Sequence, residues 1–343
     1  MRAAAGGAAS ILGAARQAGS VLVTLAGLLA LTFFMGRMLP TDPVLAIIGQ
    51  QADQAAYDMV HHRLGLDRPL PVQFALYVRD MLTGDFGDAL FTGHRVAADL
   101  SRAFPATIEL ASLAILVGVG LGVPLGVLAA VYRGTLFDHA ARVVGLIGYS
   151  SPTFWLGLMG LILFYSTLGW VGGPGRLDVG FIDSIEPHTG LLLVDALWDG
   201  DADVFWNAVG HIVLPASILG YGSMAYISRM TRSFMLEQLA QEYIVAARVK
   251  GMSRWAVIRR HAFRNILVQL VTVVALAYAF LLEGAVLTET VFAWPGFGRY
   301  LTAGLLAGDM NAVLACVLIV GVIFIGLNLL TDRLYRVLDP RTR

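Results

Sequence analysis

Long stretches without charged residues alternate with shorter charged stretches along this chain of 343 residues. A helix rises about 1.5 Å per residue, so roughly 20 apolar residues cross the hydrocarbon core of a membrane. Six of the stretches are long enough to do so. The pattern predicts an all-α membrane protein with six transmembrane helices, at about 19–39, 106–132, 143–171, 208–231, 265–289 and 310–332.

Composition supports a membrane protein and argues against several other classes. The chain is 57% hydrophobic and 14% charged, whereas soluble domains carry about 25% charged residues. Its formal net charge is zero, so we expect no nucleic acid partner. The one cysteine, Cys316, excludes a disulfide within the chain and a metal cluster of several thiolates.

The positions of Lys and Arg predict the orientation. Positive residues concentrate in the cytoplasmic segments of membrane proteins, and most of those in this chain are cytoplasmic if both termini are. We therefore expect a multi-pass protein with a cytoplasmic N-terminus at 1–18 and a cytoplasmic C-terminus. A sizeable region between the first two helices then lies outside. The predicted external regions are about 40–105, 172–207 and 290–309.

A basic, helix-prone region at about 232–264 is the most informative cytoplasmic segment. Gly251 divides it into two short stretches, each of which is predicted to be helical. The region is either a docking element for a soluble partner or a loop that only orients the protein. It and the residues just before it contain eight cations: Arg229, Arg232, Arg248, Lys250, Arg254, Arg259, Arg260 and Arg264.

Motifs for catalysis are absent from the sequence. Lys250 is the only lysine, and it does not end a G-x-x-x-x-G-K-[ST] loop, so we expect no ATP hydrolysis by this chain alone. The histidines lack the spacing of metal ligands, and no nucleophile motif occurs. The sequence therefore predicts no catalytic residue, no metal ligand and no bound cofactor.

Two features of the predicted helices bear on packing. The glycine-rich stretch 118–126 lies within an apolar span, where small residues allow helices to approach closely. Pro215 is predicted to break or kink the fourth helix.

Two carboxylates, Glu283 and Glu289, fall at the outer end of the fifth predicted helix. Ionisable groups at membrane depth are costly and often functional. These two either line a water-filled substrate path or reach the outer interface and pair with arginine. Just beyond them, Trp294 and Tyr300 are predicted at the interface, and residues 295–298 are predicted to break the helix.

The stretch EYIVAARVKG, residues 242–251, follows the pattern E-Y-I-x-x-A-R-x-K-G. This pattern resembles the cytoplasmic coupling loop of peptide permeases in binding-protein-dependent ABC importers. Val245 stands where the general form of that loop has glutamate. We refer to residues 232–264 as the coupling region. The residues that match the loop and are implied to contact an ATPase are Glu242, Tyr243, Ala246, Ala247, Arg248, Lys250 and Gly251.

Further similar stretches run almost from end to end of the chain and keep their order. They are LPTDPV at 39–44, GDFG at 84–87, PATIEL at 105–110, RMTRSFMLE at 229–237 and LTETVFAWPGFGRYL at 287–301. Together they resemble the B-type subunit of dipeptide and oligopeptide permeases. Glu283 departs from that family, where a small residue is more common.

The resemblance implies a permease with the fold of type I ABC importers in the bacterial plasma (inner) membrane. It would pair with a homologous C-type permease subunit, two ABC ATPase subunits that use ATP and Mg²⁺, and an extracytoplasmic peptide-binding protein. It would form half of the translocation path for di- or oligopeptides, within membrane lipid, and would couple ATPase closure to alternating access.

Three alternatives remain open from the sequence. Permeases for nickel or glutathione have a similar sequence pattern. A secondary transporter driven by an ion gradient would show paired carboxylates deep in the bilayer and internal repeats, and neither is evident here. A membrane-anchored scaffold would need only the long external regions.

Overall fold

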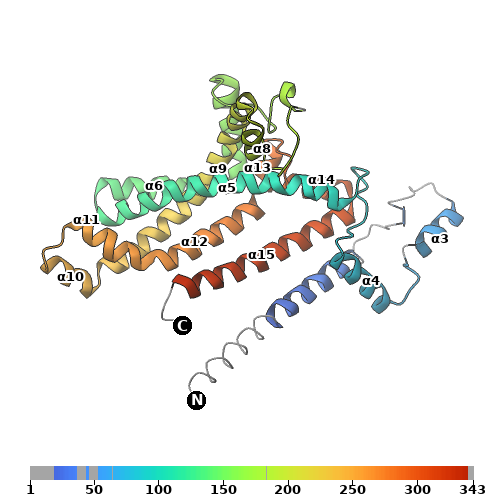
Figure 1. Ribbon diagram of the computed structural model, residues 1–343, viewed down its shortest axis with the longest axis horizontal. Helices are drawn as coiled ribbons and strands as arrows, with labels where there is room; N and C mark the ends of the chain where they lie inside the picture. Colours follow the sequence, from blue (N-terminus) through green and yellow to red (C-terminus); the bar gives the residue numbers. More distant parts are fainter. Residues whose placement is uncertain (1–18, 37–43, 46–52, 64, 183, 339–343) are drawn as a thin grey trace, which may run out of the picture. The chain divides into compact units, whose positions relative to one another are not determined.

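The computed structural model describes residues 19–36, 44–45, 53–63, 65–182 and 184–338, which are mostly helical (Figure 1). No β-strand occurs in these ranges. The described residues divide into two compact units. The first unit comprises residues 1–101 and 300–326, and the second comprises 102–299 and 327–343.

The number of long apolar helices agrees with the predicted six. Five described helices are long and apolar enough to cross a membrane, and a bent pair gives a sixth if it counts as one span. The five are Gly19–Gly36, Val96–Val131, Ala202–Leu239, Arg254–Leu282 and Met310–Leu330.

The third predicted span, 143–171, is not one straight helix. α6 (Leu136–Ser150) is followed by α7 (Thr153–Gly160) and a π-helical segment, η1 (Leu161–Thr167), and the two halves are bent by 99°. Pro152 causes the break, because a proline disfavours helical backbone in the residue before it. Ser151 accordingly is extended, with φ −82° and ψ 131°.

In the first unit, part of the predicted external region 40–105 is helical. It contains α3 (Gln54–Arg63) and α4 (Leu70–Leu82). α4 packs on the helix Gly19–Gly36, where the Tyr77 hydroxyl donates to Thr32 Oγ1 at 2.8 Å. The same unit contains the junction between α14 (Phe297–Ala307) and α15 (Met310–Leu338).

In the second unit, α5 (Val96–Val131) packs closely on α9 (Ala202–Leu239), as the glycine-rich stretch predicts. A Cβ added at Gly118 would lie 2.7 Å from Ser223 Cβ, and one at Gly126 would lie 2.5 Å from the Ser228 carbonyl oxygen. No side chain fits at such distances, so only glycine allows this contact.

Several helices extend beyond their predicted limits. α5 begins at Val96 rather than near 106, because the charged residues of its first turns do not prevent helix formation outside hydrocarbon. α9 continues through Pro215 without the predicted break. A proline removes a single N–H donor, and long membrane helices tolerate that loss.

The remaining helices of the second unit surround these two. η2 (Val179–Phe181) and α8 (Leu192–Asp199) precede α9, and α12 (Phe263–Gly284) and α13 (Val286–Val291) follow the coupling region. α13 ends before Pro295 and α14 begins after it, which confirms the helix break predicted there. A buried core cluster contains residues of α5, α9 and α12 together with Trp294.

Candidate functional site

The coupling region folds as short helices on either side of Gly251. α10 (Glu242–Val249) precedes the turn, and α11 (Arg254–Val257) and the π-helical turn η3 (Ile258–Ala262) follow it. Gly251 has φ +82°, in the left-handed region that glycine adopts without steric cost. The Ser253 hydroxyl oxygen then caps α11 by accepting from the Ala256 amide at 3.4 Å. This arrangement agrees with the predicted pair of helices.

One face of α10 is anchored in an apolar cluster. Ile244 and Ala247 are buried and lie on the same side of the helix, three residues apart. Figure 1 shows α10 and α11 beyond the end of α9 and the start of α12. Because packed interiors resist local compression, the contacts of this cluster join α10 firmly to both long helices. The buried members of the cluster are Ala130, Met235, Ile244, Ala247, Val257, Ile258, Ala262 and Ile266.

The opposite face of the coupling region combines exposed charges with exposed apolar side chains. Val249 is 82% exposed and Trp255 is 53% exposed. Large apolar side chains of this kind beside charged residues are typical of a protein-binding surface. Of the residues predicted to contact an ATPase, Ala247 is buried and the other six are exposed: Glu242, Tyr243, Ala246, Arg248, Lys250 and Gly251.

Side-chain hydrogen bonds fix the short helices α10 and α11 of the coupling region to three long helices. The Tyr243 hydroxyl donates to Gln238 of α9 at 2.7 Å and accepts from Asn265 of α12 at 2.9 Å. Arg254 donates to the carbonyl oxygen of Val131, the last residue of α5. Sequence reasoning missed these contacts, because no local pattern indicates which distant residues meet.

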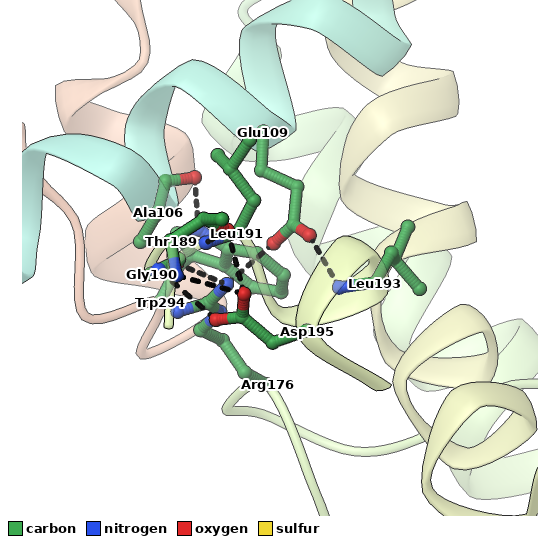
Figure 2. A network of polar contacts seen from close by, with 9 residues as sticks. All are labelled: Ala106, Glu109, Arg176, Thr189, Gly190, Leu191, Leu193, Asp195 and Trp294. Atoms are coloured by element: carbon green, nitrogen blue, oxygen red, sulfur yellow. Dashed lines mark hydrogen bonds and ion pairs between the residues drawn. The ribbon is translucent and has the colours of Figure 1, made fainter. Parts of the chain in front are cut away.

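A second polar cluster lies near the start of α9. Glu109 of α5 accepts from Arg176 Nη2 at 2.5 Å and from the Leu193 amide at 2.7 Å (Figure 2). Arg176 also donates to the Gly190 carbonyl at 3.2 Å and lies 5.6 Å from the centre of the Trp294 ring. This ion pair is largely buried, and it ties α5 to α8 and to the turn before α14.

Asp195 closes a loop onto α8 in the same cluster. Its carboxylate accepts from the Thr189 amide at 2.9 Å, the Thr189 hydroxyl at 2.6 Å and the Gly190 amide at 3.0 Å (Figure 2). The side chain is buried, so its charge is stabilised by these donors rather than by water. The loop is therefore held in one conformation.

Glu289 is fully buried within the protein, whereas one of its two predicted alternatives was an ion pair with arginine at the outer interface. It accepts from the Thr107 hydroxyl at 2.6 Å and from the Arg299 amide at 2.9 Å, instead of pairing with an arginine side chain. Burial raises the pKa of Glu289, although these donors oppose the change. Glu289 lies in α13, beyond the span Arg254–Leu282. The side chain of Glu283 lies outside the described residues.

Trp294 and Tyr300, which are predicted to lie at the membrane interface, are both buried within the protein. The Trp294 indole Nε1 donates to the Ala106 carbonyl at 2.9 Å (Figure 2). A buried indole is stable when its N–H has such a partner. In the described ranges, no three His, Cys, Asp or Glu side chains come together as a possible metal site.

Comparison with known proteins places this geometry in a family. Residues 122–343 match the family described as "Binding-protein-dependent transport system inner membrane component". Residues 13–111 match a second family, which is described as the N-terminal part of such a membrane component. The chain aligns over 323 residues, with 42% identity, to the probable D,D-dipeptide transport system permease protein DdpB of Escherichia coli, covering 94% of each chain.

Other relatives agree with this match. The di/tripeptide transport system permease protein DppB of Pseudomonas aeruginosa is 42% identical over 330 residues, which cover 96% of this chain and 98% of that one. An inward-facing structure of the MetNI methionine ABC transporter aligns with a TM-score of 0.53 and 18% identity over 71% of this chain and 97% of that one. The likeness to the methionine transporter concerns the fold alone. The chain belongs to the family of binding-protein-dependent transport system inner membrane components, and it is a multi-pass permease subunit rather than an enzyme.

Proposed function

We propose that this chain is a membrane-spanning subunit of an ATP-driven importer of di- or oligopeptides. The relatives with 42% identity over almost the whole chain carry dipeptide or di/tripeptide names. The import of nickel or glutathione is not favoured by these relatives. The chain would form half of the translocation path beside a homologous C-type permease.

The observation that carries this proposal is the two-sided coupling region. Its exposed face, with Val249 and Trp255, is suited to contact an ATPase subunit. Its buried face, with Ile244 and Ala247, packs against the ends of α9 and α12. Closure of two ATPase subunits with ATP and Mg²⁺ would push on the exposed face and shift both helices. Such coupling requires that the docked face interacts differently in the two states of the transporter.

The proposed orientation puts both termini and the coupling region in the cytoplasm of a bacterial cell. The support is the concentration of positive residues in the segments that this orientation makes cytoplasmic. An extracytoplasmic peptide-binding protein would then dock on the opposite side, near α8 and the loop that Asp195 holds. Glu283 and Glu289 stay candidates for the path, although Glu289 is fully buried in this conformation.

The test is purification of the chain from native membranes in mild detergent, with mass spectrometry and an ATPase assay. We expect a second permease, ATPase subunits and peptide-stimulated ATP hydrolysis. Recovery of the chain alone, without ATPase, would refute the proposal. Val249→Asp should release the ATPase subunits, because it places a charge in the docking face. The matched control is Val179→Asp, at a position that is 87% exposed in η2, within the region 172–207 that is predicted to be external.

A further inference from the structure

Arg229 is a cation near the cytoplasmic end of a predicted membrane span, and its side chain lines two cavities. It lies in α9, two residues before the end of the predicted span 208–231. One cavity, of about 320 Å³, lies among α5, α6 and α9. The other, of about 400 Å³, lies among α6, α7, α9 and α12. Tyr149 and Arg229 line both.

Two aromatic rings hold the guanidinium of Arg229. Its Cζ lies 5.1 Å from the centre of the Tyr149 ring and 6.0 Å from that of Tyr226. Helical side chains lean toward the N-terminus of their helix, so this guanidinium reaches back along α9, away from the coupling region. Stacking on tyrosine stabilises a cation but does not neutralise it. The charge therefore stays available to an anion.

The acidic side chain beside the first cavity, Asp138, already pairs with other arginines. Asp138 accepts from Arg232 at 2.7 Å and 2.9 Å and lies 3.8 Å from Arg142. No carboxylate pairs with Arg229 within the described part of the chain. The first cavity thus has three arginines, Arg142, Arg229 and Arg232, close to one buried carboxylate. Its charge is complementary to an anionic ligand.

The second cavity adds an apolar wall to this cation. Leu219, Ala277, Phe280 and Leu281 line it together with Arg229. A ligand that fits it combines an apolar body with one carboxylate. Arginine binds a carboxylate through two parallel N–H···O bonds, which fix the ligand's orientation as well as its charge.

We propose that Arg229, held by Tyr149 and Tyr226, binds the C-terminal carboxylate of the transported peptide while the peptide's side chains occupy the apolar cavity of Leu219 and Phe280. This inference rests on the proposed function, because it assigns a contact for the peptide in the path. It makes Arg229 a substrate-binding residue that senses the free carboxylate. A peptide whose C-terminus is amidated would lose this contact.

The experiment compares the dipeptide Ala-Phe with its C-terminal amide by saturation-transfer NMR. The sample is the purified complex of permeases and ATPases without the binding protein, so that only sites in the complex are probed. We expect wild type to bind Ala-Phe about tenfold more tightly than the amide, as for loss of a charged hydrogen-bonding partner. Arg229→Gln should abolish this preference, and Arg142→Gln, which lines only the first cavity, should keep it.

Three outcomes would overturn the assignment: equal binding of acid and amide to wild type, a preference that survives Arg229→Gln, or no binding of either peptide. Equal loss of both peptides in Arg229→Gln would indicate that the guanidinium instead contacts lipid or the second permease. If Arg229→Gln does not assemble, Arg229→Lys and Tyr149→Leu replace it, and each should weaken the preference. Uptake of Ala-Phe into proteoliposomes by the complete wild-type transporter tests the proposed function separately.

Discussion

Asp138 and Arg232, which are 94 positions apart, form a two-pronged ion pair between α6 and α9. Arg232 Nε donates to one carboxylate oxygen at 2.7 Å, and Nη2 donates to the other at 2.9 Å. Asp138 also accepts from the Gly134 amide at 3.0 Å, and its side chain is 2% exposed. The pair therefore fixes α6 to α9 at the first residue of the coupling region, ten residues before α10 begins.

Removal of Arg232 should destabilise the protein strongly. Arg232→Gln leaves the buried Asp138 carboxylate without its main partner, which costs about 3–5 kcal/mol in buried pairs. We expect the lower end of this range, because the Arg232 side chain is 23% exposed. Thermal unfolding of the purified protein in detergent measures the effect. Arg142→Gln is the control, since Arg142 is 3.8 Å from Asp138 and half exposed. Equal effects of the two substitutions would contradict the assigned role.

The close contact between α5 and α9 predicts a large difference between two glycines of one helix. Gly126→Ala puts a Cβ 2.5 Å from the Ser228 carbonyl oxygen and 2.7 Å from Thr231 Cβ. Such overpacking costs about 1–3 kcal/mol. Gly120→Ala has no atom within 4 Å of the added Cβ, and it should leave stability unchanged or slightly higher. Melting temperatures of the two variants provide the measurement, and similar losses would argue against this packing.

Glu289 should make stability depend on pH. Its usual pKa is 4.5, and burial raises the pKa in the folded protein. Because the folded protein binds this proton more tightly than the unfolded chain does, protonation of Glu289 adds stability below pH 4.5. This added stability is lost as the pH rises through the raised pKa of the folded protein. Glu289→Gln stays neutral, so its melting temperature relative to wild type should increase as pH rises above 4.5. A difference that does not vary with pH would show that Glu289 does not titrate in this way.

The sequence predicted features that depend on local composition. Charge-free runs predicted the spans, and the glycines at 118–126 predicted the contact between α5 and α9. The bend at Pro152 had a local signal as well, because the residue before a proline avoids helical backbone. That signal was hidden within an uncharged run that looked like one continuous span.

Long-range pairing could not be predicted in the same way. Glu109 and Arg176 are separated by 67 positions and bind each other only because α5 and the segment after η1 come together. The burial of Glu289 could not be predicted either, because it depends on Thr107 and on the turn before α14. Which side chains meet is decided by helix packing, and hydrophobic periodicity does not specify that partner choice.

Substitutions at Gly251 and Gly134 distinguish a specific role of the coupling region in ATPase coupling from a general loss of stability. Gly251 has φ +82° and Gly134 has φ +80°, and a Cβ at either would meet no atom within 4 Å. Valine at either position should therefore cost at least about 1–2 kcal/mol through backbone strain alone. Gly251→Val alters the turn between α10 and α11, so we expect it to abolish peptide-stimulated ATP hydrolysis in the assembled transporter while membrane insertion is retained. Gly134→Val alters the turn between α5 and α6, and it should lower the melting temperature similarly while most of the stimulation is kept.

Gly251→Asn should be tolerated, because asparagine adopts left-handed backbone more readily than valine. Normal stimulation in Gly251→Val, or equal uncoupling by both valine variants, would remove the argument that this turn transmits ATPase closure.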